Sequence, residues 1–286
     1  MGFRCGAFSL ILWALPLAAH AWSGTGHRVI VSIAERDLSP IARIETARIL
    51  GVPPNSLLRG MMEASTWADE NRSDESAPWH YINHHFRTDG KRTKMKPEPE
   101  NVVVAIERFR KVLKDRAKPD AERRPALVYV LHFVGDAHQP LHGVARDSDR
   151  FPAGDRGGND FGIQPPGEFA WMERPPKNLH ALWDSGAGLF PSEQGGLGPV
   201  LERRIRVQAD TLRAALARRS FRRLADPNPM NWSRESLDGA KRVVYRLEEN
   251  AEPSAAYLAE ARRLAAQRAT LAGYRLADLL NRALGG

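Results

Sequence analysis

His132, Asp136 and His142 lie close together in the stretch 131–142, LHFVGDAHQPLH. His132 and Asp136 are four residues apart, so on a helix both side chains would lie on one face. Pro140 cannot continue the helical hydrogen bonding, and His142 follows it on a redirected backbone. Imidazole and carboxylate are ligands that zinc prefers. A core helix with a buried His–Asp hydrogen bond is the alternative that this stretch alone leaves open.

A second pair repeats this spacing, because His180 and Asp184 are also four residues apart. Asp69 and His80 lie in two further segments that contain tryptophan, WAD at 67–69 and WH at 79–80. Histidine and aspartate are costly to bury unless a partner compensates for the lost hydration. The recurrence of such groups therefore favours a metal site over ordinary core packing.

The N-terminal stretch 1–21 has the features of a secretory signal peptide. Arg4 supplies a positive charge, residues 7–18 are mostly apolar, and AHA at 19–21 matches an A-x-A cleavage site. The apolar run is too short to span a bilayer comfortably. We therefore expect a secreted or periplasmic protein whose mature domain covers 22–286. The single cysteine, Cys5, lies in the leader, so no disulfide is expected in the mature chain.

Cleavage after residue 21 would give Trp22 a free α-amino group. That amine could bind a metal ion once deprotonated, and the carbonyl oxygen of Trp22 would complete a five-membered chelate. The ordinary pKa of an α-amine is about 7.7–8.0, so loss of its proton to a metal is feasible near neutral pH. His27 follows five residues later, near the start of the same expected helix.

Composition and periodicity predict an all-α, single-domain protein. The chain has 286 residues, of which 42% are apolar and 27% charged, enough for a sizeable core. Its net charge of +8 suits polyanions such as nucleic acid or anionic lipid, but does not identify a fold. Apolar residues recur at helical spacing, and no strand pattern stands out. The expected helices are 22–38, 39–50, 57–72, 100–114, 121–139, 178–186, 199–224, 233–250 and 254–284.

In kind and order, these residues resemble the zinc-dependent single-strand-specific nucleases, the S-one/P-one type of fungi and plants. That family shares a fold superfamily with zinc phospholipase C. The resemblance covers essentially the whole mature chain. The matching motifs are Trp22…His27, Trp67-Ala68-Asp69…Arg72, His80-Tyr81-Ile82, His132…Asp136…His142, Gly157-Gly158-Asn159, His180…Trp183-Asp184 and Gly273-Tyr274-Arg275-Leu276-Ala277.

The resemblance implies a helical fold built around a trinuclear zinc cluster, with three Zn²⁺ as cofactors. The implied ligands are Asp69, His80, His132 and Asp136 for one ion; Trp22, His27 and Asp136 for a second; and His142, His180 and Asp184 for the third. Asp136 would bridge the first two ions. Nitrogen and oxygen ligands without thiolate agree with zinc.

The resemblance also implies an endonuclease that hydrolyses single-stranded DNA and RNA to 5′-phosphate products, with 3′-nucleotides as further substrates. Asp69 and Arg72 are the implied catalytic residues. Asp69 would orient the nucleophile, and Arg72 would neutralise charge on the phosphoryl oxygens. The implied substrate-binding residues are Tyr81, Asn83, Gly158 and Asn159. A base would stack on Tyr81, but Asn83 stands where fungal members usually have aspartate, which leaves base preference open.

Two other functions compete with this hypothesis. A zinc phospholipase C would use similar ligands, but that branch normally has glutamate in one ligand pair. Here both four-spaced pairs end in aspartate, Asp136 and Asp184, which favours a nuclease. The second is a zinc- or nucleic acid-binding protein without catalysis, which the presence of Asp69 and Arg72 disfavours. We expect a monomer without stable membrane association.

Overall fold

The structure is a computed structural model that describes residues 22–170, 172–193 and 196–285. The expected signal peptide, 1–21, lies outside the described residues. The described chain is mostly helical, which confirms the predicted fold class. Its helices and strands are α1 (Gly24–Arg36), α2 (Pro40–Leu50), α3 (Leu57–Ala64), α4 (Trp67–Glu70), β1 (His84–Phe86), α5 (Val102–Lys114), α6 (Asp120–Asp136), β2 (Val144–Arg146), α7 (Leu179–Asp184), α8 (Pro199–Ala215), α9 (Pro229–Arg242) and α10 (Ala255–Leu284).

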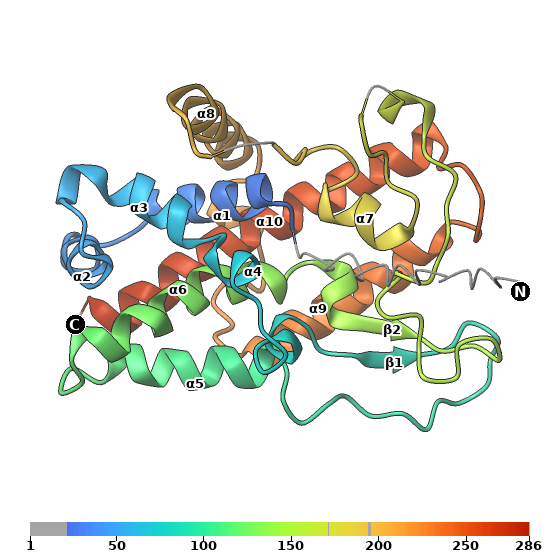
Figure 1. Cartoon of the computed structure of the whole chain (residues 1–286), viewed down its shortest axis with the longest axis horizontal. Helices are drawn as coiled ribbons and strands as arrows, with labels where there is room; N and C mark the ends of the chain where they lie inside the picture. Colours follow the sequence, from blue (N-terminus) through green and yellow to red (C-terminus); the bar gives the residue numbers. More distant parts are fainter. Residues whose placement is uncertain (1–21, 171, 194–195, 286) are drawn as a thin grey trace, which may run out of the picture.

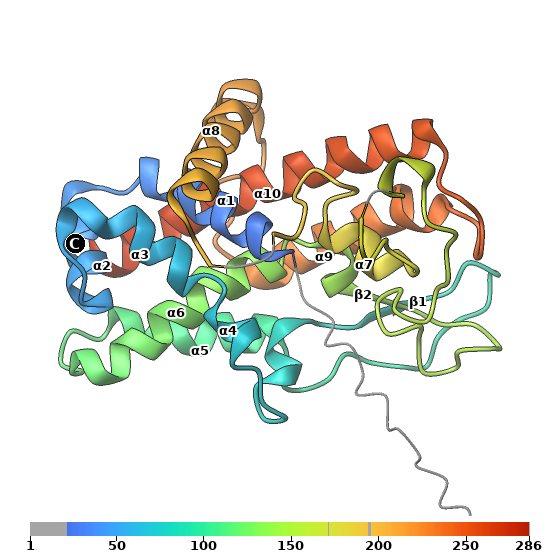
Figure 2. The same cartoon turned by 45° about the horizontal axis from the view of Figure 1, so that its top comes forward.

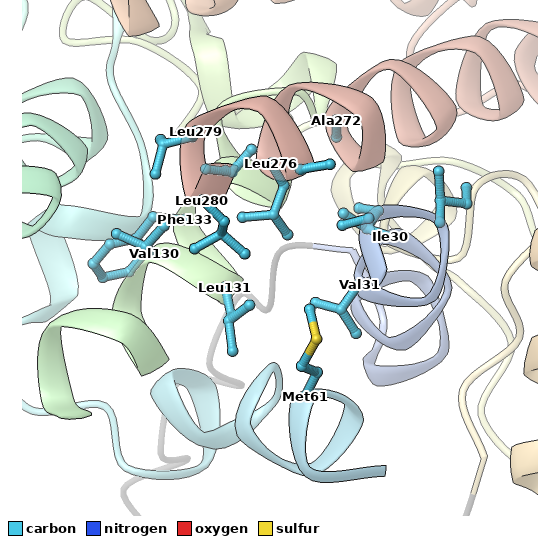
Figure 3. Close-up of a cluster of buried hydrophobic side chains, with 14 of the residues drawn as sticks. Ile30, Val31, Met61, Val130, Leu131, Phe133, Ala272, Leu276, Leu279 and Leu280 are labelled. Atoms are coloured by element: carbon cyan, nitrogen blue, oxygen red, sulfur yellow. The ribbon is translucent and has the colours of Figure 1, made fainter. Parts of the chain in front are cut away.

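The core forms where α1 and α6 pack against the long C-terminal helix and α3 packs against α1 and α6. Figures 1 and 2 show α10 running along most of the molecule, with α1 and α6 beside it. Figure 3 shows the contact in side-chain detail: Ile30 of α1, Leu131 of α6 and Leu276 of α10 point toward one another. These side chains are fully buried. The core therefore fixes α1 and α6, the two helices that carry the first expected ligands.

Gly273 of α10 permits the close crossing of α1 and α10. A Cβ atom at this position would lie 2.5 Å from Ile33 Cγ2 and 2.9 Å from the carbonyl oxygen of Ile30. Only glycine fits so near another backbone. The family-like motif at 273–277 therefore has a packing role.

The expected helix 57–72 is divided in two, and this corrects the prediction. The chain leaves the helical path at Ser65 and Thr66, and the short helix α4 follows. The break exposes the carbonyl oxygen of Ser65, which accepts a hydrogen bond from His132 Nδ1 at 2.7 Å. In a continuous helix that carbonyl would accept from the backbone of Asp69 instead. The break in the helix therefore frees the carbonyl group that orients the His132 ring.

The structure also contains two strands, which the sequence did not predict. β1 and β2 pair in parallel with His84 opposite Val144. Each has three residues, too few for an alternating pattern to be recognised. The pair continues a contact between the segments after His80 and after His142, where Ile82 N donates to His142 O at 2.9 Å. It therefore ties two expected ligand segments together.

Helix α6 ends at Asp136, three residues earlier than expected. Turn-type hydrogen bonds follow, from His138 N to Gly135 O and from Gln139 N to Asp136 O, both 3.0 Å. Pro140 then begins a short 3₁₀ turn, Pro140–Gly143, that carries His142. The expected helices 199–224 and 233–250 also end early, at residues 215 and 242. Within the described residues, no helix is both long and apolar enough to cross a bilayer.

Candidate metal centre and active-site cleft

Histidine and aspartate side chains from distant segments meet in three adjoining groups. Each group offers donor atoms that all lie within 4.8 Å of one another. The groups are Asp69, His80 and His132; His27, His132 and Asp136; and His142, His180 and Asp184. They contain all eight side chains that the sequence analysis assigned as metal ligands.

Asp136 connects the first two groups. Its Oδ2 lies 3.1 Å from His80 Nδ1 and 3.3 Å from His132 Nε2. Its Oδ1 lies 3.4 Å from His27 Nε2. Both histidines of the first group also lie 3.4 Å from Asp69 Oδ1. One fully buried carboxylate therefore faces a different set of donors with each of its oxygens.

The third group is more open. His142 Nε2 and His180 Nε2 are 3.3 Å apart, and His180 Nε2 lies 3.4 Å from Asp184 Oδ1. Gln139, which the sequence analysis assigned no role, donates from Nε2 to the same oxygen of Asp184 at 2.8 Å. The sequence did offer one indication of this role, because Gln139 lies in the motif 131–142 directly before Pro140.

These spacings fit donors that share zinc ions. Donors held about 2.0–2.2 Å from a tetrahedral zinc ion lie about 3.3–3.6 Å from one another. The distances from the Asp136 oxygens to the histidine nitrogens, and between the Nε2 atoms of His142 and His180, are 3.1–3.4 Å. Among the described residues, Asp136 Oδ1, His80 Nε2 and both ring nitrogens of His27 are buried without a hydrogen-bond partner. A shared cation would compensate Asp136 Oδ1 and His27 Nε2, which lie 3.4 Å apart. His80 Nε2 and His27 Nδ1 are the ring nitrogens turned away from that carboxylate.

Three of the histidines are oriented by backbone carbonyl groups. His132, His142 and His180 each donate from Nδ1 at 2.7 Å. In each ring the lone pair of Nε2 then points toward the three donor groups. The accepting carbonyls are those of Ser65, His80 and Gly157. This is the outer hydrogen bonding that fixes the tautomer of a metal-binding imidazole.

Burial keeps most of these imidazoles neutral. It lowers the pKa of His27 to about 3, and it also lowers the pKa of His80 and His142. Burial acts the same way on His132, but Asp136 and Asp69 outweigh it and raise that pKa. Burial raises the pKa of Asp184 well above its usual range. An ionised Asp184 therefore needs a nearby cation, and neutral imidazoles are the form that binds metal.

Gly135 lets His27 approach α6. The rings of His27 and His132 stack with centroids 3.9 Å apart. A Cβ at residue 135 would lie 2.9 Å from His27 Nδ1, closer than real Cβ contacts. Glycine is therefore required between His132 and Asp136 for α1 and α6 to bring their ligands together.

The ligands on α7 are positioned by the glycine loop before it. Asn178 caps α7 by accepting from Ala181 N at 2.8 Å. Gly157 has φ +60°, and a Cβ there would lie 2.5 Å from Leu141 O. The close approach lets Gly157 O accept from His180, so a positive-φ glycine sets the direction of a ligand ring.

Trp22 lies at the edge of the cluster. Its ring is fully buried and donates to Gly135 O at 3.1 Å, and the next backbone amide, Ser23 N, donates to Asp184 O at 2.7 Å. The backbone of Trp22 is thus held between α6 and α7. Metal binding by its amine and carbonyl stays a prediction, because cleavage after residue 21 concerns the undescribed segment.

Comparison with known proteins decides the family. The sequence model of the S1/P1 nuclease family matches residues 22–285. The chain belongs to the S1/P1 nuclease family. It is therefore a hydrolytic nuclease with nucleic acid as substrate, in a zinc-dependent family, and the predicted family and enzyme class are confirmed.

Three relatives illustrate the degree of similarity. Endonuclease 2 of Arabidopsis thaliana is 31% identical over 214 residues, which cover 68% of this chain and 67% of the relative. Nuclease S1 of Aspergillus oryzae is 25% identical over 199 residues, 64% of this chain and 59% of its own length. Nuclease P1 of Penicillium citrinum is 26% identical over 175 residues, 57% of each chain. The chain thus spans less than two thirds of the two fungal nucleases.

A cleft of about 730 Å³ opens beside the predicted metal ligands. Asp69, His180 and Asp184 line it, and so does Asn159 of the predicted base-binding loop. The far side is lined by 172–178, where Lys177 adds a cation. The cleft is large enough to enclose a small ligand, so its dimensions suit a short segment of nucleic acid.

The two predicted catalytic residues lie on α4 and just after it. Asp69 belongs to the first ligand group. The side chain of Arg72 is partly buried and donates from Nη2 to Ala77 O at 3.1 Å. The charge of Arg72 acts on Tyr81, because it counters the rise in pKa that burial causes there. This charge also lowers the pKa of His142, so Arg72 acts on one predicted metal ligand and on Tyr81, the predicted base-stacking residue.

The four predicted base-binding residues do not lie together around one cavity. Within the described chain, Tyr81 and Asn83 are not among the residues that line the 730 Å³ cleft, whereas Asn159 is. Gly158 is buried, and its carbonyl accepts from His180 N at 3.2 Å. Gly158 thus supports α7.

Glu98 is a neighbour of the base platform that the sequence analysis missed. Its Oε1 accepts from Asn83 Nδ2 at 2.6 Å. Its Oε2 is buried without a hydrogen-bond partner among the described residues. It lies in a polar loop with no helical or motif pattern, so only the fold could bring it to Asn83. A carboxylate therefore lies beside the amide of Asn83.

Proposed function

We propose that this protein is a zinc-dependent endonuclease that cleaves single-stranded DNA and RNA and leaves 5′-phosphates. It would also remove phosphate from 3′-nucleotides. The observation that carries this proposal is the shared carboxylate of Asp136, whose two oxygens face two separate donor groups beside a cleft. Such an arrangement suits a close pair of cations acting on one phosphate.

The residues present fit three zinc ions. Asp69, His80, His132 and Asp136 would hold one; Trp22, His27 and Asp136 a second; and His142, His180 and Asp184 the third. Bound zinc would supply Lewis acidity, both for activating water near neutral pH and for stabilising the leaving oxygen.

The protein's own side chains complete the reaction. Asp69, at the cleft wall, would orient the attacking water by accepting its hydrogen bond. Arg72 would donate to the non-bridging phosphoryl oxygens as their negative charge increases. Gln139 would hold Asp184 in place through the 2.8 Å hydrogen bond.

Preference for single strands would come from Tyr81. Its ring is partly exposed beside Arg72, so an unstacked base could lie on it while the adjoining phosphate reaches the cluster. A base paired within a duplex could not. Secretion or export to the periplasm belongs to the same proposal, because removal of 1–21 would create the amine of Trp22.

The test combines metal analysis with cleavage assays. Mass spectrometry of the secreted protein should give Trp22 as first residue, and elemental analysis three zinc per chain. The protein should degrade single-stranded DNA and RNA much faster than duplex DNA and should not hydrolyse phosphatidylcholine. A chelator should abolish cleavage, and zinc should restore it. Full cleavage after zinc removal, or equal rates on duplex DNA, would refute the proposal.

A further inference from the structure

Arg28 is a buried cation in the wall of the cleft. It follows His27 on α1, is only 9% exposed and lines the same 730 Å³ cavity as the metal ligands. Among the described residues, its guanidinium makes no hydrogen bond or ion pair, and Nε is fully buried. Glu70 and Glu63 stabilise its charge only from a greater distance. Withdrawing part of a guanidinium from water is costly unless an anion pairs with it.

Thr25 and the start of α1 lie beside Arg28. Thr25 is 3% exposed, lines the cleft, and its Oγ1 has no hydrogen-bond partner among the described residues. A Cβ on Gly24 would lie 3.6 Å from Arg28 Nη1, so the guanidinium lies against the first turn of this 13-residue helix. The N-terminus of a helix attracts anions. Gly24, Thr25 and Arg28 therefore all line the cleft at the start of α1, where Ser23 Oγ caps the amide of Gly26.

This place is separate from the metal ligands. Adjacent residues on a helix point about 100° apart, so Arg28 is directed away from the cluster that His27 faces. The carboxylates that chiefly stabilise Arg28 are Glu70 and Glu63 rather than the ligand carboxylates. Asp69 lines the same cleft, so an anion beside Arg28 would lie along the cleft from the reacting phosphate.

We propose that Arg28, Thr25 and the first turn of α1 form a second phosphate site, which binds a backbone phosphate next to the scissile one. The proposal rests on the proposed cleavage of single strands, because the phosphates of such a strand recur at regular spacing. Contacts of this kind position a strand without reading its sequence. The site therefore predicts that the enzyme favours substrates with more than one phosphate.

The test compares two substrates in the zinc-loaded enzyme. A dinucleoside monophosphate carries only the scissile phosphate, whereas a tetranucleotide also carries adjacent ones. Arg28→Gln should lower kcat/KM for the tetranucleotide roughly ten- to hundredfold and leave the dinucleoside monophosphate unchanged. Arg28→Lys should recover part of the loss, and Thr25→Val should cause a smaller one. Arg222→Gln, which removes an exposed arginine after α8, is the matched control and should change neither substrate.

A neutral methylphosphonate at the adjacent linkage locates the contact. It should weaken cleavage by the wild type about as much as Arg28→Gln does, and should have no further effect in that variant. Thermal stability gives a separate readout, because removal of an unpaired buried charge should leave Tm unchanged or raised. Equal losses on both substrates, or a methylphosphonate effect that persists in full in Arg28→Gln, would overturn the proposal.

A failure of the proposed cleavage activity can be distinguished from a failure of the phosphate site. If the wild type cleaves neither substrate, the cleavage proposal fails. The phosphate site is then decided by equilibrium binding of a phosphorothioate oligothymidylate to the zinc-loaded protein, which requires no turnover. Weaker binding by Arg28→Gln than by Arg222→Gln would support the site, and equal Kd values would refute it.

Discussion

Replacing Gly135 by alanine tests whether helix packing positions the metal ligands. The new Cβ would lie 2.9 Å from His27 Nδ1 and 3.2 Å from Ile30 Cδ1. The first distance is about 0.5 Å shorter than an ordinary contact of 3.4 Å, so His27 must move by about that much. Metal–ligand distances tolerate only about ±0.2 Å. The displacement therefore exceeds what the proposed second zinc site, with Trp22, His27 and Asp136, could tolerate.

We expect Gly135→Ala to weaken zinc binding at that site roughly ten- to hundredfold, the range seen when the support of a metal ligand is lost. Overpacking would cost about 1–3 kcal/mol, partly offset by about 0.5–1 kcal/mol from the better helix propensity of alanine. Zinc titration with a competing chelator measures the first effect, and denaturant unfolding of the zinc-loaded protein the second.

Gly239→Ala is the matched control for this substitution. It also adds a methyl group inside a helix, but there the nearest atom is Leu264 Cδ2 at 3.3 Å, the end of a flexible side chain. This variant should bind zinc normally. Wild-type zinc affinity and activity in Gly135→Ala would show that the approach of α1 to α6 does not set the geometry of the cluster.

Three further substitutions test individual roles. Asp136→Asn should reduce zinc content by about two ions per chain, because one carboxylate faces both donor groups; wild-type content by elemental analysis would contradict the bridging role. Arg72→Gln should retain all zinc but lower kcat by about 10²–10³; a change in KM alone, measured with single-stranded DNA, would contradict a role in the transition state. Glu98→Gln should change the relative cleavage rates of the four homopolymers by up to about tenfold, with zinc content unaffected; unchanged ratios would place Glu98 outside base recognition.

Residue spacing predicted the helical class, and it selected side chains that the fold brings together, because the four-residue pairs are local. His132 and Asp136, and likewise His180 and Asp184, lie on one face of a helix in any context that keeps the helix. The same reasoning could not locate the points where helices end or are interrupted. The interruption at Ser65 depends on His132, which is far away in the sequence and provides the hydrogen bond that the backbone gives up.

Residues whose role depends only on tertiary contact were beyond prediction. Arg28 looks like an ordinary charged residue on an amphipathic helix until its burial is known. Glu98 lies in a loop without periodicity and reaches Asn83 only through the fold. The two short strands were missed for a related reason, since their pairing is fixed by the neighbouring contact between the segments of His80 and His142.

The predicted ligand histidines also make hydrogen bonds to distant backbone carbonyls. These bonds explain how residues of the stretch 131–142 can belong to all three groups. His132 is tied to the break before α4, and His142 to the backbone of His80, each through Nδ1. Because α6 ends at Asp136 and not at Pro140, the chain has room to turn before His142. Gln139 uses that turn to reach Asp184. If α6 continued to Pro140, His132 and Asp136 would still lie on one face. Gln139 and His142 would then lie too far from His180 and Asp184.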